Sequence, residues 1–119
     1  MIIDVRDNPG GSYDQVVNIV DRLVPKGIIV YTEDRNENRQ YEYSDETELE
    51  IPLVILINGN SASASEILAG AVKDHKKGTL IGTTTFGKGL VQAVIDLTDG
   101  SGLKFTVARY FTPNGICKL

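Results

Sequence analysis

Apolar residues along this 119-residue chain gather in short runs whose spacing changes between that of strands and that of helices. Aliphatic, β-branched runs at 2–5, 28–32 and 51–57 predict buried strands. Apolar residues recur three and four positions apart over 12–24 and 62–76, which predicts two helices. Strands that alternate with helices in this way favour an α/β fold over a helical bundle or a barrel.

Turn-forming residues predict hairpins between the remaining strands. A polar segment at 33–40 joins 28–32 to a return strand at 40–44, and Thr98-Asp99-Gly100-Ser101-Gly102 joins strands at 90–97 and 103–111. A further turn is expected at 112–115. Gly78 is predicted to stop the second helix, because glycine favours the backbone conformation that ends helices.

Composition narrows the function classes. The net charge is −4 and no basic stripe is present, which argues against a nucleic-acid partner. No apolar run approaches the roughly 18 residues needed to cross a bilayer. The single cysteine, Cys117, excludes an internal disulfide and a cysteine-ligated zinc site. With one histidine and scattered acids, we expect no metal and no other cofactor.

Ser63 has the setting of a nucleophile. It follows the buried run 51–57 and the turn Asn58-Gly59-Asn60, and it opens the second helix, whose positive dipole end faces whatever the serine attacks. Glu66, three residues on, also completes the pattern of a capping box. A purely structural cap therefore stays open as the alternative for Ser63, as it does for Ser61 and Ser65.

A serine nucleophile needs a base to take its proton. His75 lies twelve residues after Ser63 on the same predicted helix, about 18 Å away at helical rise, and is interpreted as an exposed residue of the last turn. Lys88 is the candidate base, because it stands between Gly87 and Gly89 in apolar surroundings, and burial lowers a lysine pKa. An ordinary loop lysine is the alternative interpretation.

Three segments taken together resemble the carboxyl-terminal processing peptidases, the tail-specific serine–lysine proteases. They are Asp-Val-Arg-Asp-Asn-Pro-Gly-Gly at 4–11, Asn-Gly-Asn-Ser-Ala-Ser-Ala-Ser-Glu-Ile at 58–67 and Thr-Phe-Gly-Lys-Gly-Leu-Val-Gln at 85–92. The resemblance implies a ClpP/crotonase-like core with a mixed sheet, two main helices and inserted hairpins. It also implies a serine-type endopeptidase that cleaves proteins near their C-terminus.

The resemblance assigns roles residue by residue. It implies that Ser63 is the nucleophile, that neutral Lys88 is the general base, and that Gln92 orients the lysine. These are the residues of a serine–lysine dyad and its supporting glutamine.

The remaining matched residues would stabilise charge or the fold. Backbone N–H groups of Ala64 and of Gly10 or Gly11 would form the oxyanion hole, where glycine allows close approach. Asp74 matches an acidic position that we expect to support the fold more than the chemistry.

The resemblance also implies a context. We expect residues 1–119 to be a single, truncated catalytic core of an exported parent protein that acts in the cell envelope, the periplasm or on the outer side of a membrane. Its partners would be the C-termini of substrate proteins, a PDZ domain of the parent that this chain does not contain, and a second copy joined through exposed apolar surface or sheet edges.

Two alternatives to an active peptidase core stay open. The chain could be a catalytically inactive fragment, or a substrate-binding or scaffold module of the same fold. A crotonase-like acyl-CoA enzyme shares the fold class and a glycine-rich oxyanion hole, but needs no serine–lysine pair.

Overall fold

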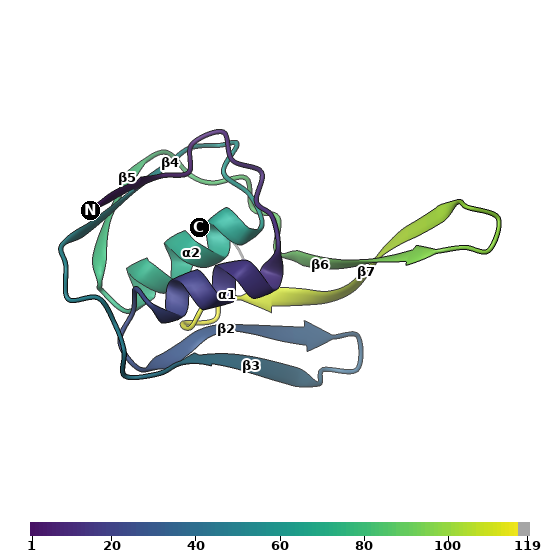
Figure 1. Cartoon of the computed structure of the whole chain (residues 1–119), viewed down its shortest axis with the longest axis horizontal. Helices are drawn as coiled ribbons and strands as arrows, with labels where there is room; N and C mark the ends of the chain where they lie inside the picture. The colour runs from purple at the N-terminus through teal and green to yellow at the C-terminus, as the bar shows by residue number, and fades with distance from the viewer. Residues whose placement is uncertain (117–119) are drawn as a thin grey trace.

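The structure, a computed structural model, describes residues 1–116 and consists of two sheets with two helices between them (Figure 1). The inference drawn from Cys117 falls outside the described residues. Neither helix in the described part of the chain is long and apolar enough to span a membrane.

The first sheet is parallel and carries the site at one end. Its strands are β1 (Ile2–Asp4), β4 (Leu53–Ile57) and β5 (Gly78–Gly82), in the order β1-β4-β5. The central strand β4 is aliphatic throughout because both of its faces are at least half-buried. Asp4 pairs with Leu56, and Ile57 pairs with Gly82. The loops that follow the three strands therefore all leave from the carboxyl end of the sheet.

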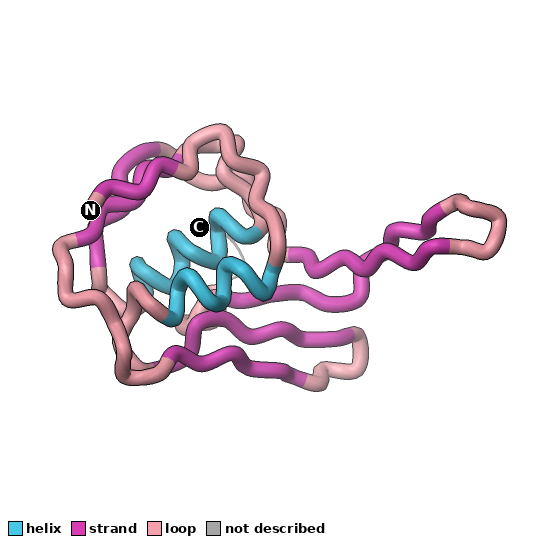
Figure 2. The backbone as a smooth tube through the Cα atoms, in the orientation of Figure 1, coloured by secondary structure: helices cyan, strands magenta, loops and turns pink. Residues whose placement is uncertain are grey.

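Two helices fill the space between the sheets. Helix α1 (Tyr13–Asp21) buries Val16 and Val20, and α2 (Ala64–Asp74) is buried along every residue from 64 to 72. Figure 2 shows the helices side by side in the interior. Each fully buried aliphatic side chain of this core contributes about 1.5–3 kcal/mol. Because α2 is packed on all sides, its first residues are held firmly in place.

The second sheet is antiparallel, in the order β3-β2-β7-β6. It consists of β2 (Gly27–Asp34), β3 (Arg39–Ser44), β6 (Leu90–Asp96) and β7 (Gly102–Phe111). The outer half of the β6–β7 hairpin projects from the body of the molecule (Figures 1 and 2). With this hairpin included, the molecule is 50 Å long and 28 Å by 22 Å across.

The α/β class, the two helices and both hairpins are confirmed. Parallel and antiparallel strands are both present, but each kind forms a sheet of its own, because the helical layer separates them. The predicted turn at 112–115 is also present, with Gly115 N–H donating to Thr112 O at 2.8 Å.

Both helices are shorter than predicted, and the stop signal assigned to Gly78 is wrong. Lys76 takes the left-handed conformation at the end of α2, with φ 55°, and Lys77 N–H closes the turn on Val72 O at 3.0 Å. Gly78 instead starts β5, where a Cβ would lie 2.5 Å from Leu53 O. Helix α1 ends at Asp21, although the apolar spacing continues to residue 24.

His75 is not the exposed residue that was expected. It is half-buried at the end of α2, and its Nε2 lies 2.7 Å from Ile28 O. The histidine therefore joins α2 to β2, at the opposite end of the helix from Ser63.

Candidate active site

Three loops meet at the carboxyl end of the parallel sheet: residues 5–12 after β1, 58–63 after β4, and 83–89 after β5. Ligand and catalytic sites of α/β folds are commonly built at this end of the strands. The first loop carries the glycines, the second carries Ser63, and the third carries Lys88.

Ser63 sits in a strained turn between β4 and α2. Its φ is 56° and its ψ is −119°, which is unusual for a residue other than glycine. Such strain gathers at functional sites, where the surrounding contacts hold it. The flanking alanines, Ala62 and Ala64, are both buried, so the serine is presented by a turn that packing fixes on either side.

Gly10 lies directly against that turn. A Cβ on Gly10 would lie 2.7 Å from Ala62 O and 2.8 Å from Ala64 N, and the glycine itself has φ 102°. Only glycine combines this conformation with so close an approach.

The two glycines differ in what their surroundings offer an oxyanion. Gly10 N–H already donates to Asn8 Oδ1 at 2.9 Å. Gly11 is exposed, and a Cβ built on it would meet nothing within 4 Å. Gly11 and Ala64 line the same cavity, whereas Gly10 does not line it.

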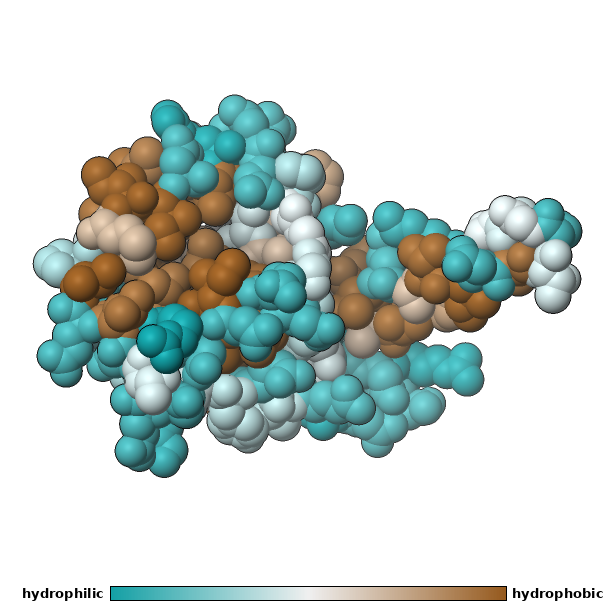
Figure 3. Space-filling view, in the orientation of Figure 1, coloured by the Kyte–Doolittle hydropathy of each residue, from teal (hydrophilic) through white to brown (hydrophobic). Residues whose placement is uncertain are grey.

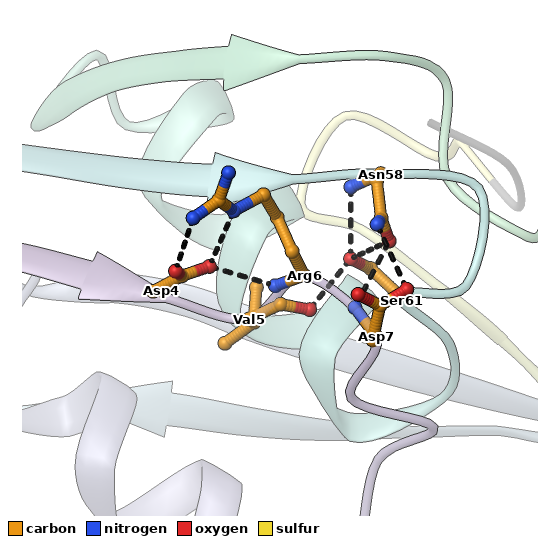
Figure 4. A network of polar contacts seen from close by, with 6 residues as sticks. All are labelled: Asp4, Val5, Arg6, Asp7, Asn58 and Ser61. Atoms are coloured by element: carbon orange, nitrogen blue, oxygen red, sulfur yellow. Dashed lines mark hydrogen bonds and ion pairs between the residues drawn. The ribbon is translucent and has the colours of Figure 1, made fainter.

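Side-chain hydrogen bonds fasten the glycine loop to the serine turn (Figure 4). Asp7, with φ 57°, accepts from Asn58 Nδ2 at 3.0 Å and from Asn60 Nδ2 at 2.8 Å. The Ser61 hydroxyl donates to Val5 O at 2.6 Å. The two amides lower the pKa of Asp7, so its carboxylate stays charged well into the acidic range.

The start of the glycine loop is held by an ion pair at its base. Arg6 Nη2 lies 2.7 Å from Asp4 Oδ2, and Arg6 Nε donates to Asp4 Oδ1 at 2.9 Å. These hydrogen bonds from Arg6 lower the pKa of Asp4 to about 2.

Glu66 is the functional residue that the sequence analysis did not identify beyond its place in a capping box. Glu66 is buried, with a relative exposure of 3%. Oε1 accepts from Thr85 Oγ1 at 2.6 Å and from Gly87 N–H at 2.7 Å. Oε2 accepts from Ser63 N–H at 3.0 Å and from Lys88 N–H at 2.9 Å. One carboxylate thus binds both the serine turn and the lysine loop.

A fifth donor to Glu66 comes from the second sheet. Tyr110 of β7 donates its hydroxyl toward Glu66 Oε2 and toward Ser63 O, each at 3.3 Å. The capping-box spacing could reveal only the Ser63 partner, because the other donors lie 19 to 44 residues further along the chain.

A cavity of about 290 Å³ brings the predicted residues together. Ser63, Ala64, Lys88, Gln92 and Gly11 all line it. The rest of the wall is mostly apolar and consists of Tyr13, Ile67, Leu90, Val91, Val94, Lys104 and Tyr110. The sequence analysis identified none of these seven as site residues.

Tyr13 of α1 is part of this wall. Burial, reinforced by the charge of Glu42, raises the pKa of Tyr13 to about 12, so this side chain is neutral. Lys104 is exposed on β7 and lines the same cavity.

Asp74 lies away from the cavity. It ends α2, and its Oδ2 accepts from Asn114 N–H at 2.9 Å, which joins the helix to the turn after β7. Among residues 1–116 no cluster of three or more His, Cys, Asp or Glu side chains is placed to hold a metal ion.

Known proteins share this sequence and fold. The sequence pattern of peptidase family S41 matches residues 1–119. The carboxy-terminal-processing protease of Bartonella bacilliformis is 47% identical over 117 residues, which is 96% of this chain and 27% of that protein. The chloroplastic C-terminal processing peptidase of Tetradesmus obliquus is 47% identical over 119 residues, 98% of this chain and 25% of its own length.

A solved structure agrees with these sequence matches. The photosystem II D1 C-terminal processing protease superposes with a TM-score of 0.87 at 44% identity, covering 99% of this chain and 32% of that one. The chain thus spans about a quarter of the length of the curated relatives named above. Because the match runs along the whole chain in both sequence and fold, the chain belongs to peptidase family S41.

Proposed function

We propose that this chain is the catalytic core of a serine endopeptidase that cleaves proteins near their C-terminus, with Ser63 as nucleophile and Lys88 as general base. One observation carries the proposal. Ser63 and Lys88 line one cavity, and the backbone N–H groups of the same two residues bind one oxygen of Glu66.

In the first half of the reaction, neutral Lys88 Nζ takes the proton of Ser63 Oγ as the oxygen attacks the peptide carbonyl carbon. The negative charge that develops on the carbonyl oxygen is stabilised by the N–H groups of Ala64 and Gly11. Gly11 is preferred to Gly10 because Gly10 N–H is already bound by Asn8. The C–N bond then breaks, and the leaving nitrogen takes the proton from Lys88.

In the second half, water gives a proton to Lys88 and attacks the acyl ester on Ser63. The ester bond breaks, Ser63 Oγ recovers a proton from the lysine, and the acyl half leaves as a carboxylate. Gln92 of β6, which lines the same cavity, is the group that orients the lysine side chain in this proposal.

The names of the relatives support the substrate class. Relatives at 47% identity are named carboxy-terminal-processing protease and C-terminal processing peptidase, so we assign protein C-termini as substrates here. An exported location, a PDZ domain in the complete protein and self-association of the core belong to the same proposal.

A second candidate function is a binding or scaffold module without catalysis. It would use the same cavity for binding alone, without the chemistry assigned to Ser63 and Lys88. The crotonase-like alternative loses its support, because the match to peptidase family S41 runs from residue 1 to 119.

The test is Ser63→Ala and Lys88→Ala in the complete protein that carries this sequence. We expect kcat for cleavage of a C-terminal peptide to fall on the order of 10⁴-fold or more in each variant, as for other covalent dyads and triads. Ser101→Ala and Lys26→Ala, at exposed positions remote from the cavity, are the matched controls. Unchanged cleavage by Ser63→Ala would disprove the assignment.

A further inference from the structure

Each of the three loops of the site contributes residues to two different cavities. Pro9, Ala62 and Phe86 line a second cavity, of about 410 Å³, together with Asp7 and Asn60. Gly11, Ala64 and Leu90, which follow two to four residues later at or just beyond the ends of these loops, line the first cavity together with Ser63 and Lys88. The catalytic turn therefore lies between two cavities, and each loop contributes a residue to both.

Lys88 is the residue shared by the linings of these two cavities, whereas Ser63 and Ala64 line the first and not the second. The acyl half of a substrate is bonded to Ser63 and its oxygen faces Ala64, so the acyl half occupies the first cavity. The leaving nitrogen takes its proton from Lys88, so the chain that begins at this nitrogen continues on the other side of the lysine. That side is the second cavity.

We propose that the second cavity is the leaving-side subsite, which binds the first residue after the scissile bond and prefers an uncharged, apolar side chain there. This inference rests on the proposed function, because it takes the roles of Ser63 and Lys88 as given. The first residue after the scissile bond would then contribute to substrate specificity, and Phe86 would be the residue that contacts it.

The wall of this subsite is apolar and held in place. The Phe86 side chain is exposed to 62%, while its backbone N–H donates to Ser61 O at 3.0 Å. The two residues after it are bound through their N–H groups to Glu66. The backbone of this segment is thus fixed, and the ring is an exposed hydrophobic surface in a cavity that Pro9 and Ala62 also line. An apolar side chain placed on the ring would remove that surface from water.

The polar groups of the subsite disfavour an acidic residue. Asp7 lines the subsite, and its negative charge repels a second carboxylate. The amide Nδ2 of Asn60 donates one of its two N–H groups to Asp7. A carboxylate placed here would lose part of its hydration and gain few donors in return, which disfavours it.

The experiment uses the complete protein and three substrates with one common acyl half. Two are peptides whose first leaving residue is Leu or Asp, and the third is the methyl ester, which has no leaving-side residue. We expect wild type to prefer the Leu peptide over the Asp peptide by about 10- to 100-fold in kcat/KM, the range of apolar-pocket discrimination. Phe86→Ala lowers kcat/KM for the Leu peptide about tenfold and changes the methyl ester less than twofold.

Leu90→Ala is the matched variant on the acyl side, where Leu90 lines the first cavity. Because all three substrates share the acyl half, we expect Leu90→Ala to change their kcat/KM values by the same factor and to leave the Leu/Asp ratio unaltered. Phe86→Leu, which keeps an apolar surface, is expected to restore part of the preference for Leu.

The outcomes separate the subsite from the function on which it rests. Equal falls for the Leu peptide and the ester in Phe86→Ala would mean that Phe86 only holds the lysine loop, and would overturn the subsite. A wild type without preference between Leu and Asp would do the same. Cleavage retained by Ser63→Ala, measured alongside, would overturn the proposed function and the subsite together.

Discussion

Gly10 and Gly11 are neighbours in the sequence, yet an added methyl group would meet quite different surroundings at each. At Gly10 it would lie 2.7 Å from Ala62 O on a backbone with φ 102°, and at Gly11 it would meet nothing within 4 Å. We expect Gly10→Ala to displace the serine turn and to lower kcat about 100-fold, the typical cost of misplacing a catalytic group by an ångström. The fall in kcat is measured by peptide cleavage with the purified Gly10→Ala variant and wild type.

Gly11→Ala is the matched control for that prediction. It keeps the backbone N–H and has room for the methyl group, so its free energy of unfolding is expected to stay within about 0.5 kcal/mol of wild type. A Gly10→Ala variant as active as Gly11→Ala would show that the close contact with Ala62 and Ala64 is unimportant.

Glu66 accepts hydrogen bonds from the backbone N–H groups of Ser63, Gly87 and Lys88. Glu66→Gln replaces one oxygen by an NH₂ group, which would face a donor and leave it without a partner. We expect the free energy of unfolding, from urea titration, to fall by about 2–3 kcal/mol, since hydrogen bonds to buried charges contribute about 1.5–3 kcal/mol each. Glu46→Gln, at a residue whose side chain is 77% exposed, is the control and is expected to change little.

At the scale of elements, the end of α2 stores a small strain. Lys76 holds φ 55°, which costs a residue with a Cβ about 1 kcal/mol relative to glycine. We expect Lys76→Gly to raise the free energy of unfolding by about 0.5–1 kcal/mol, measured by thermal or urea unfolding. Lys73→Gly, inside the last helical turn, is expected to lower it by about 1 kcal/mol. Equal effects of the two substitutions would contradict this account.

The same region shows what the sequence could and could not predict about the elements. Hydrophobic spacing predicted the helices and strands, because burial of one face or of both imposes it. The end of α2 was placed at Gly78 because glycine favours helix ends, whereas the structure uses Lys76 there and needs Gly78 for its close approach to Leu53 O. That approach joins two strands distant in sequence, so local propensity cannot indicate it.

For the site, the resemblance to the carboxyl-terminal processing peptidases proposed Ser63, Lys88 and Gln92, and all three line one cavity. The organising role of Glu66 could not be predicted. Thr85, Gly87 and Lys88 come together with it only after the parallel sheet aligns its loops, and a hydrogen bond across 19 or more residues leaves no local pattern.

For the molecule as a whole, the outer half of the β6–β7 hairpin is a two-stranded ribbon outside the core. Every residue from 94 to 104 is exposed, and hydrophobic residues gather on it (Figure 3). They are Val94, Ile95, Leu97 and Leu103. An isolated two-stranded ribbon is marginally stable in water, because it lacks a layer to pack against.

We therefore expect hydrogen exchange to be fastest in this ribbon. Amides of residues 94–104 are expected to exchange far sooner than those of β4 and α2, whose exchange requires unfolding of the core. The β2–β3 hairpin is the internal control, because Ile29 and Val30 bury part of it against the helices. Protection at 94–104 equal to that of β2 would mean that another surface covers the ribbon.

One oxygen atom, Glu66 Oε2, binds the backbone of both the proposed nucleophile and the proposed base. Ser63 N–H and Lys88 N–H lie 3.0 and 2.9 Å from Glu66 Oε2, and that atom belongs to the helix packed between the sheets. Because both backbone segments are bound to this atom, we expect heating to release residue 63 and residues 87–88 in one step. Peptide cleavage and tertiary structure, followed over the same temperature range, are then expected to be lost together.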